Sequence, residues 1–371
     1  MRANRKFSAS GSTRYIRSDG LWENIGSQVV IGAADGSLFL LNGSEKTEGS
    51  RLRIAVWGGG SLGLLWTARL ASLFPETVLL VRTQEQRDWI RRRGILLTHP
   101  SGEKERISAK VRWVGEVDEP FDCLFIMVKQ RDLRDVAKRL AAFSRLPAWV
   151  VLWQNGLGQD EPFASVLPRE ALCGAVTTEG ALREGPGEVR HTGEGMTWIG
   201  PFSAEPVRPG IGAEIVEKLK NAGVRIEWEN QILRRIWEKV AVNCAINPLT
   251  ALLRIPNGGL LHSDDARFLI KSVVEETVSV ARAEGMELEA ETLLRRTMEI
   301  CRKTAANRSS MLQDVERGRP TEIDWINGEV VRRGKRAGIA TPVNQVLLRL
   351  IHLLEMRRDP DGGPSDGSAT A

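Results

Sequence analysis

The sequence predicts an α/β domain followed by a mostly helical domain, and three features support this fold class. Its 371 residues exceed what one hydrophobic core usually serves, so two domains are expected. Between residues 51 and 200, short apolar runs alternate with helical segments. After about residue 200, helical periodicity continues with few strand signals. We therefore predict domains over residues 51–225 and 226–358.

The two ends of the chain differ from this pattern. Residues 1–18 are basic, contain several serines and lack acidic residues. This composition is typical of an unstructured leader or an over-extended gene start, and also of a transit peptide. We expect residues 1–50 to form a leader of uncertain structure, and the Gly/Ser/Asp/Pro-rich residues 359–371 to form a disordered tail.

The composition narrows the class of protein. A hydrophobic fraction of 42% and a charged fraction of 27% are ordinary for a soluble globular protein. The net charge of +5 is spread along the chain, which disfavours nucleic-acid binding, and no apolar run approaches the roughly 20 residues of a membrane span. Cys123, Cys173, Cys244 and Cys301 have neither disulfide-framework nor metal-ligand spacing. We expect reduced thiols, no metal site and a cytoplasmic location.

A strand, a glycine-rich turn and a helix open the folded body. The apolar run at residues 52–57 predicts a strand, and residues 64–73 and 77–81 predict a helix and a second strand. Further strands are expected at residues 123–128 and 149–153. These runs are continuously apolar, as in parallel strands that helices cover on both faces.

The turn itself has the pattern G-x-G-x-x-G, formed by Gly58, Gly60 and Gly63. In such a turn the first glycine permits the tight bend, the second lets backbone N–H groups approach a pyrophosphate, and the third lets helix and strand pack closely. The phosphates would lie at the positive end of the following helix. The sequence therefore predicts a Rossmann-type domain whose dinucleotide contacts also include the intervening residues Gly59, Ser61 and Leu62.

The end of the second strand favours NADPH over NADH. An NAD site usually has an acidic residue there, which bonds the ribose hydroxyls. This chain has Arg82 and Thr83 instead. A guanidinium and a hydroxyl can bind a ribose 2′-phosphate, which a carboxylate would repel.

A polar stripe marks one of the predicted helices. Helices are expected at residues 211–222, 231–253, 263–284, 290–315, 321–337 and 342–356. Lys239, Asn243 and Asn247 are each four residues apart and share one face, which is either solvated or the floor of a polar cleft. Pro248 disfavours helical geometry at Asn247, so the helix is expected to kink or end there.

Several motifs together resemble the ketopantoate reductase (2-dehydropantoate 2-reductase) family. The resemblance covers residues 51–356. The motifs are the glycine turn, Val128-Lys129, residues 154–158, the stretch from Trp237 through Asn247-Pro248 to Ala251, residues 307–314, and Thr321-Glu322-Ile323-Asp324. The last of these also resembles a helix cap. Asp132 departs from the family, which often has Gln there.

The resemblance implies an oxidoreductase with an active site between the two domains. The expected reaction is NADPH-dependent reduction of 2-dehydropantoate in pantothenate and coenzyme A biosynthesis, with Lys239 as the general acid. Matching positions imply that Asn243, Asn247, Asn257, Asn307 and Ser310 bind the substrate. They imply that Lys129, Asn155 and Gly180 contact the cofactor, and that Glu322 approaches the nicotinamide ribose near Lys239.

Two other functions remain open from the sequence. Relatives of this kind reduce other small 2-keto acids with the same fold and the same lysine. A catalytically silent NADP-binding regulator is the third hypothesis, but retention of Lys239 beside the asparagines argues against it, because cofactor sensing needs no proton donor. The sequence is compatible with a monomer or a homodimer.

Overall fold

A computed structural model describes residues 28–32, 38–42, 52–117, 120–202 and 210–356. The chain divides into two compact units, residues 1–51 and residues 52–371. In the first unit, β1 (Gln28–Gly32) pairs antiparallel with β2 (Leu38–Asn42). The remainder of the predicted leader and the predicted tail at 359–371 lie outside the described residues.

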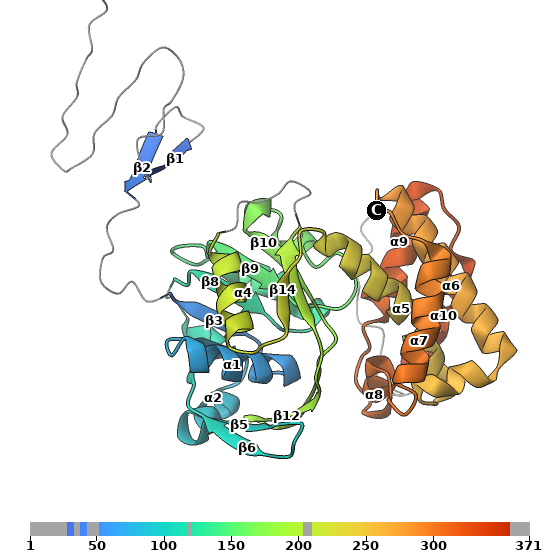
Figure 1. Ribbon diagram of the computed structural model, residues 1–371, viewed down its shortest axis with the longest axis horizontal. Helices are drawn as coiled ribbons and strands as arrows, with labels where there is room; N and C mark the ends of the chain where they lie inside the picture. The colour runs from blue at the N-terminus through green and yellow to red at the C-terminus, as the bar shows by residue number, and fades with distance from the viewer. Residues whose placement is uncertain (1–27, 33–37, 43–51, 118–119, 203–209, 357–371) are drawn as a thin grey trace, which may run out of the picture. The chain divides into compact units, whose positions relative to one another are not determined.

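An eight-stranded sheet forms the centre of the α/β part of the second unit (Figure 1). Its order is β14-β13-β10-β9-β8-β3-β4-β7, and every neighbouring pair is parallel except β10 and β13. The strands are β3 (Ile54–Trp57), β4 (Val78–Val81), β7 (Lys110–Trp113), β8 (Cys123–Ile126), β9 (Trp149–Leu152), β10 (Leu172–Thr177), β13 (Thr197–Pro201) and β14 (Ile226–Trp228). The helices of this α/β part are α1 (Ser61–Leu73), α2 (Gln84–Arg93), α3 (Leu133–Leu140) and α4 (Ile211–Asn221). The predicted Rossmann-type α/β fold is confirmed.

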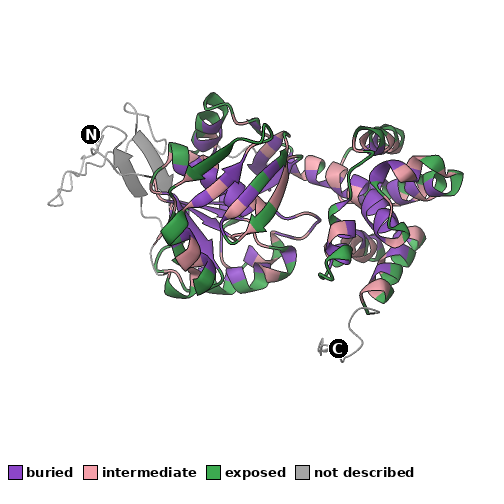
Figure 2. Ribbon diagram, turned by 90° about the horizontal axis from the view of Figure 1, so that it is seen from below, coloured by how far each residue is buried: buried purple, intermediate pink, exposed green. Residues whose placement is uncertain are grey.

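The sheet is buried on both faces, as the continuously apolar strands predicted. All residues of β3, β4, β8 and β9 are buried, which Figure 2 shows as purple strands in the α/β part. Along β3, Ile54 and Val56 belong to one core cluster, whereas Ala55 and Trp57 belong to the other. Successive side chains of a strand point to opposite faces, so these two clusters are the two sides of the sheet.

A second, four-stranded sheet was not predicted from the sequence. Its order is β11-β12-β5-β6, formed by β11 (Gly180–Gly185), β12 (Glu188–Gly193), β5 (Ile95–Thr98) and β6 (Lys104–Ile107). Helix α1 packs against β11 and β12. Most residues of β6 and β11 are partly or fully exposed, so these strands lack the apolar runs that identified the main sheet.

The helical part is built around one long helix, α5 (Ile232–Leu253), which packs against α6, α7, α8 and α10. The others are α6 (Asp264–Ala283), α7 (Ala290–Lys303), α8 (Ser310–Glu316), α9 (Asn327–Ala337) and α10 (Pro342–Met356). The 3₁₀ turns that matter below are η2 (Gln130–Asp132), η5 (Asn257–His262) and η6 (Ile323–Trp325). Among the helices of the described residues, none combines the length and hydropathy that a membrane span requires.

Two predicted helix boundaries are wrong, one because a side chain caps a new helix and the other because a 3₁₀ turn precedes the helix. The helix expected over residues 290–315 is two helices, because α7 ends at Lys303 and α8 begins at Ser310. The Ser309 hydroxyl accepts a hydrogen bond from the backbone N–H of Leu312 at 3.1 Å and so caps α8. The helix expected over 321–337 begins at Asn327 and is preceded by η6.

Helix α5 does not end at Asn247 but continues through Pro248 to Leu253. Proline has no N–H, so the carbonyl of Cys244, four residues earlier, loses its helical partner. The side-chain amide of Asn327 donates to this carbonyl at 3.1 Å. The buried Asn327 therefore replaces the missing hydrogen bond and lets the helix carry the whole polar stripe.

Candidate active site

The glycine turn has the geometry that a dinucleotide requires. Gly58 has φ +129°, and a Cβ there would lie 2.7 Å from the Met127 carbonyl oxygen. A Cβ on Gly63 would lie 1.7 Å from the Gly58 carbonyl oxygen, so only glycine lets α1 pack this closely on the turn. A Cβ on Gly60 would meet no atom within 4 Å. The second glycine thus faces open space, where a pyrophosphate can approach the backbone.

The first turn of α1 offers free backbone donors to this space. Gly60 is the N-cap residue and gives no side-chain cap, and the first turn contains no acidic residue. The Ser61 hydroxyl accepts a hydrogen bond from the backbone N–H of Arg183 at 3.0 Å, and Leu62 is half-buried. Uncapped N–H groups at a helix N-terminus favour an anion. The residues present therefore fit a dinucleotide diphosphate.

Arg82 lies at the end of β4 with an exposed side chain. Its carbonyl accepts a hydrogen bond from the Trp113 indole at 3.1 Å, which fixes the backbone. The neighbouring Thr83 hydroxyl caps α2 by accepting from the Gln86 N–H at 3.3 Å. Of the two groups predicted to bind a 2′-phosphate, the exposed guanidinium has no hydrogen bond or ion pair among the described residues, whereas the hydroxyl already serves as a cap.

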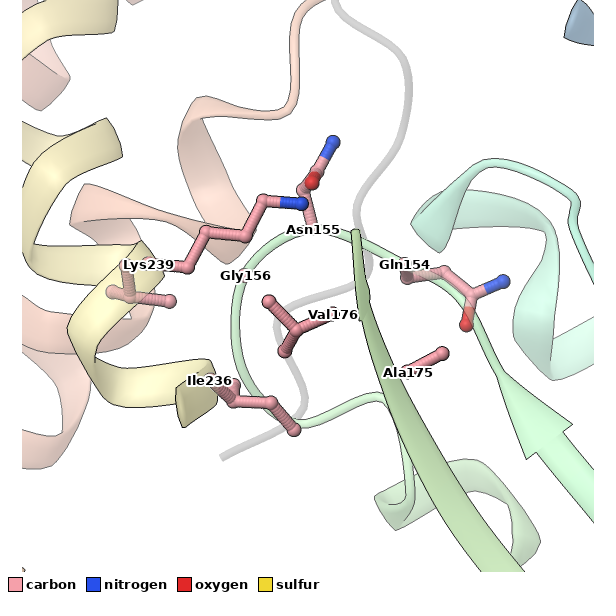
Figure 3. A pocket seen from close by; sticks show the side chains of 8 residues that line it. Gln154, Asn155, Gly156, Ala175, Val176, Ile236 and Lys239 are labelled. Carbon is pink, nitrogen blue, oxygen red and sulfur yellow. The ribbon is translucent and has the colours of Figure 1, made fainter. Parts of the chain in front are cut away.

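Lys239 extends from α5 toward the carboxyl end of the main sheet. Its ammonium donates to the carbonyl oxygen of Thr177, the last residue of β10, at 3.0 Å. Figure 3 shows this side chain reaching toward the loop that carries Asn155. Lys239 and Asn155 line a hollow of about 10 Å³. Its other lining residues are Gln154, Gly156, Ala175, Val176, Ile236 and Val240. A hollow of this size holds about one water molecule and is too small for a keto acid. These residues therefore form one wall of a larger site.

Burial makes Lys239 a suitable proton donor. It lowers the pKa of the ammonium to about 8, and the negative charge of the Glu322 carboxylate opposes this shift. At neutral pH the ammonium keeps its proton, yet it releases the proton far more readily than an exposed lysine. A pKa near the working pH is the property that general acid catalysis needs.

An ion-pair network connects the helical part to the α/β part beside Lys239. Asn155, in the loop after β9, donates to Glu322 Oε2 at 3.3 Å, and Lys129 Nζ lies 3.6 Å from the same oxygen. Lys129 also donates to Asp314 Oδ2 of α8 at 3.1 Å. The side chains of Asp314 and Glu322 are only 12% and 10% exposed, so both carboxylates depend on these partners.

Gly156 brings this loop close to the helical part. It has φ +97°, and a Cβ there would lie 2.2 Å from the Trp325 carbonyl oxygen, which also accepts from the Leu157 N–H at 2.9 Å. Gln154 holds the other side of the loop by donating to the carbonyls of Ile126 and Val128 at 2.9 and 3.0 Å. Asn155 is therefore positioned by its two neighbours.

The pH dependence of the reaction follows from the Lys239 environment. With Lys239 as the general acid that the sequence predicts, the proton is lost as pH rises through the pKa of about 8, so kcat/KM for the predicted keto acid should fall about tenfold per pH unit above that value. Glu322→Gln removes the charge that raises this pKa, so the fall should begin at lower pH. Stopped-flow rates across pH 6–10 measure both profiles, with the exposed Glu287→Gln as control. An identical break in Glu322→Gln and the wild type contradicts this electrostatic link.

The two asparagines of the polar stripe are available to a ligand. Asn243 is half-buried and Asn247 is 6% exposed, and among the described residues neither side-chain amide has a hydrogen-bond partner. Unpaired amides in such surroundings are costly unless water or a ligand satisfies them. Both lie on the same face of α5 as Lys239.

Asn257 and Asn307 meet through the backbone. The Asn257 N–H donates to the Asn307 carbonyl at 2.9 Å, and the Asn257 side chain donates to the Thr304 hydroxyl at 2.9 Å. The Asn257 Oδ1 is buried without a partner. Asn307 and Ser310 have exposed side chains, whereas Ser309 is buried as the cap of α8.

The structure joins Lys129, Asn155 and Glu322 in one network beside Lys239, whereas no hydrogen bond or ion pair among the described residues joins Gly180 to this network. Gly180 begins β11, and a Cβ there would lie 2.6 Å from the Thr192 hydroxyl, so its small size is already explained by strand packing. Sequence reasoning missed two site groups, the Thr177 carbonyl and Asp314. Asp314 lies within the family motif, but a backbone carbonyl leaves no side-chain signal.

Comparisons with known proteins match this arrangement over most of the chain. A family model described as "Ketopantoate reductase PanE/ApbA" matches residues 54–204, and one described as "Ketopantoate reductase PanE/ApbA C terminal" matches residues 231–355. A 2-dehydropantoate 2-reductase of Vibrio cholerae is 35% identical over 304 residues, covering 82% of this chain and 98% of that protein. One of Archaeoglobus fulgidus is 36% identical over the same shares of each chain.

Solved structures share the fold. A PanE/ApbA family ketopantoate reductase from Ralstonia eutropha JMP134 has a TM-score of 0.74 and 30% identity, covering 83% of this chain and 100% of that chain. A D-mandelate dehydrogenase solved with NADH and anilino(oxo)acetate has a TM-score of 0.77 at 24% identity, covering 83% and 99%, which shows a common fold. The chain belongs to the ketopantoate reductase family and is an oxidoreductase acting on CH–OH groups.

Proposed function

We propose that the protein reduces 2-dehydropantoate to pantoate with NADPH, a step of pantothenate and coenzyme A biosynthesis. The observation that carries this proposal is Lys239, an ammonium with a pKa of about 8 at the carboxyl end of the sheet. The relatives named 2-dehydropantoate 2-reductase support the substrate, because they match the chain over both of its parts.

The residues of this chain account for the proton side of the reaction. A bound nicotinamide would supply the hydride that reduces the carbonyl carbon. The Lys239 ammonium donates its proton to the carbonyl oxygen, which becomes the hydroxyl of the product. Before transfer its positive charge stabilises the negative charge that develops on that oxygen. The Thr177 carbonyl and Glu322 orient the ammonium and keep it protonated.

We assign the orientation of the substrate to two asparagine side chains of α5 and to three residues that follow α5 in the chain. Asn243 and Asn247 lie on the Lys239 face and have unpaired side-chain amides among the described residues, so they can bind the hydroxyl and carboxylate of the keto acid. Asn257 offers a buried, unpaired Oδ1 to a hydroxyl donor. Asn307 and Ser310 are exposed and complete the predicted set.

A panel of 2-keto acids tests the function. NADPH oxidation, followed by absorbance, should have the highest kcat/KM with 2-dehydropantoate among substrates that include pyruvate, 2-oxoisovalerate and phenylglyoxylate. A higher kcat/KM with another keto acid would assign the enzyme to that substrate. NADPH binding without turnover of any of them would favour the regulator instead.

The preference for NADPH is assigned to Arg82. Its guanidinium is exposed and unpaired among the described residues, and no carboxylate occupies the end of β4. Arg82→Ala should weaken NADPH binding about tenfold or more and leave NADH binding unchanged, because a charge-assisted hydrogen bond to the 2′-phosphate is lost. Fluorescence titration of both cofactors measures the ratio, and an unchanged ratio would remove Arg82 from this role.

We assign the cellular compartment of the protein from the state of its cysteines. Cys123, Cys173, Cys244 and Cys301 are buried and unpaired, as expected for a protein kept under reducing conditions. We therefore assign the reaction to the cytoplasm.

A further inference from the structure

Three arginines from separate segments lie close enough to one another for their charges to interact. Arg82 follows β4, Arg183 lies in β11, and Arg319 follows α8 in the helical part. Burial lowers the pKa of Arg183, and the positive charges of Arg319 and Arg82 lower it further. Among the described residues, none of the three side chains forms an ion pair with a carboxylate. Like charges held together without a counter-ion favour binding of an anion.

Arg183 is held directly against the turn. Its backbone N–H donates to the hydroxyl of Ser61, the first residue of α1, at 3.0 Å. Its Nε donates to the Gly185 carbonyl at 2.9 Å, which orients the guanidinium, and its terminal nitrogens have no hydrogen-bond partner among the described residues. The neighbouring Gly60 faces space that no atom fills within 4 Å of a Cβ position. An anion on the free N–H groups of α1 would therefore lie within reach of Arg183.

Arg319, in the helical part, is close enough to Arg183 for its positive charge to lower the pKa of that arginine. Its backbone N–H donates to the Asp314 carbonyl at 2.8 Å, which closes the turn after α8. The carboxylate of Asp314 binds Lys129 of the α/β part at 3.1 Å. Arg319 is thus anchored at the contact between the two parts, with its side chain exposed.

We propose that Arg183 and Arg319 bind the diphosphate of the dinucleotide from two sides, and that Arg82 alone reads its 2′-phosphate. This inference rests on the proposed function, because it requires a dinucleotide at the glycine turn. Arg183 is the one of the three that is tied to Ser61, where the diphosphate would lie on the helix N-terminus. Arg183 belongs to the α/β part and Arg319 to the helical part. In the cofactor-free protein their positive charges repel each other, whereas the bound diphosphate attracts both.

The binding of NADPH and NADH separates these roles without measuring turnover. Arg183→Gln and Arg319→Gln should each raise the dissociation constants of NADPH and NADH by the same factor, about tenfold, because both cofactors contain the diphosphate. Arg82→Gln should raise that of NADPH alone. Fluorescence titration measures each dissociation constant. Arg91 in α2 and Arg295 in α7 are exposed, so Arg91→Gln and Arg295→Gln are the matched controls and should bind both cofactors as the wild type does.

The substitutions should not impair folding, because Arg183 and Arg319 are exposed and their removal relieves repulsion. The cofactor-free variants should therefore melt no lower than the wild type. Unchanged affinities in Arg183→Gln and Arg319→Gln overturn the inference, and so does a loss confined to NADPH. If Arg319→Gln raises only the KM of the keto acid, Arg319 binds the substrate and its assignment is wrong. A wild-type protein that binds neither cofactor would instead refute the proposed function.

Discussion

Replacing Lys239 with alanine is expected to lower kcat about 10³-fold, while the dissociation constant for NADPH stays close to that of the wild type. The ammonium is the group that would protonate the carbonyl oxygen, and its charge acts most strongly in the transition state. Its hydrogen bond goes to the Thr177 carbonyl rather than to the glycine turn, so cofactor affinity should not depend on it. Single-turnover stopped-flow and fluorescence titration measure the two quantities.

Two further variants decide whether a loss at Lys239 is chemical or structural. Lys239→Met retains most of the side-chain volume and should lose as much activity as Lys239→Ala, because neither can donate a proton. Lys271→Ala removes a lysine of α6 that is 57% exposed and, within the described residues, pairs with Glu275 alone, so it should retain full activity. A Lys239→Met enzyme that keeps its rate would eliminate Lys239 as the acid.

The fold could be predicted where burial is continuous. Strands β3, β4, β8 and β9 are buried on both faces, so their sequences are uninterrupted apolar runs. The second sheet could not be predicted in this way, because β6 has the sequence KERI and three of its four residues are exposed. Its pairing of β5 with β12 also joins segments distant in the chain.

The site could be predicted where a side chain does the chemistry. Lys239, Asn243 and Asn247 follow from one helical spacing, but their placement depends on Asn327, which lies 83 residues from the Cys244 carbonyl it satisfies. The pairing of Lys129 with Asp314 spans 185 residues, and no local pattern indicates it. The Thr177 carbonyl has no sequence signature at all, since every residue carries one. Such tertiary contacts become visible only in the folded chain.

The glycine turn gives the second large effect, because two of its glycines are needed for different reasons. Gly63→Ala should lower the free energy of unfolding by about 3 kcal/mol, since its Cβ would lie 1.7 Å from a backbone oxygen and α1 would have to shift. Gly60→Ala should leave the stability of the cofactor-free protein within about 0.5 kcal/mol of the wild type. Its φ of −83° suits alanine, and its Cβ would meet no protein atom within 4 Å. Urea unfolding measures both values.

The same space that makes Gly60→Ala harmless to folding should make it harmful to binding. A Cβ there would project into the space assigned to the diphosphate and keep it from the backbone N–H groups of α1, so the dissociation constant for NADPH should rise about tenfold or more. Gly193→Ala is the matched control, because its Cβ also meets no atom within 4 Å but lies at the end of β12 rather than at a helix N-terminus. If Gly60→Ala changes neither the stability of the protein nor its affinity for NADPH, no phosphate approaches this turn. A fully stable Gly63→Ala would mean that α1 can move away from β3 without cost, contrary to the close packing seen between them.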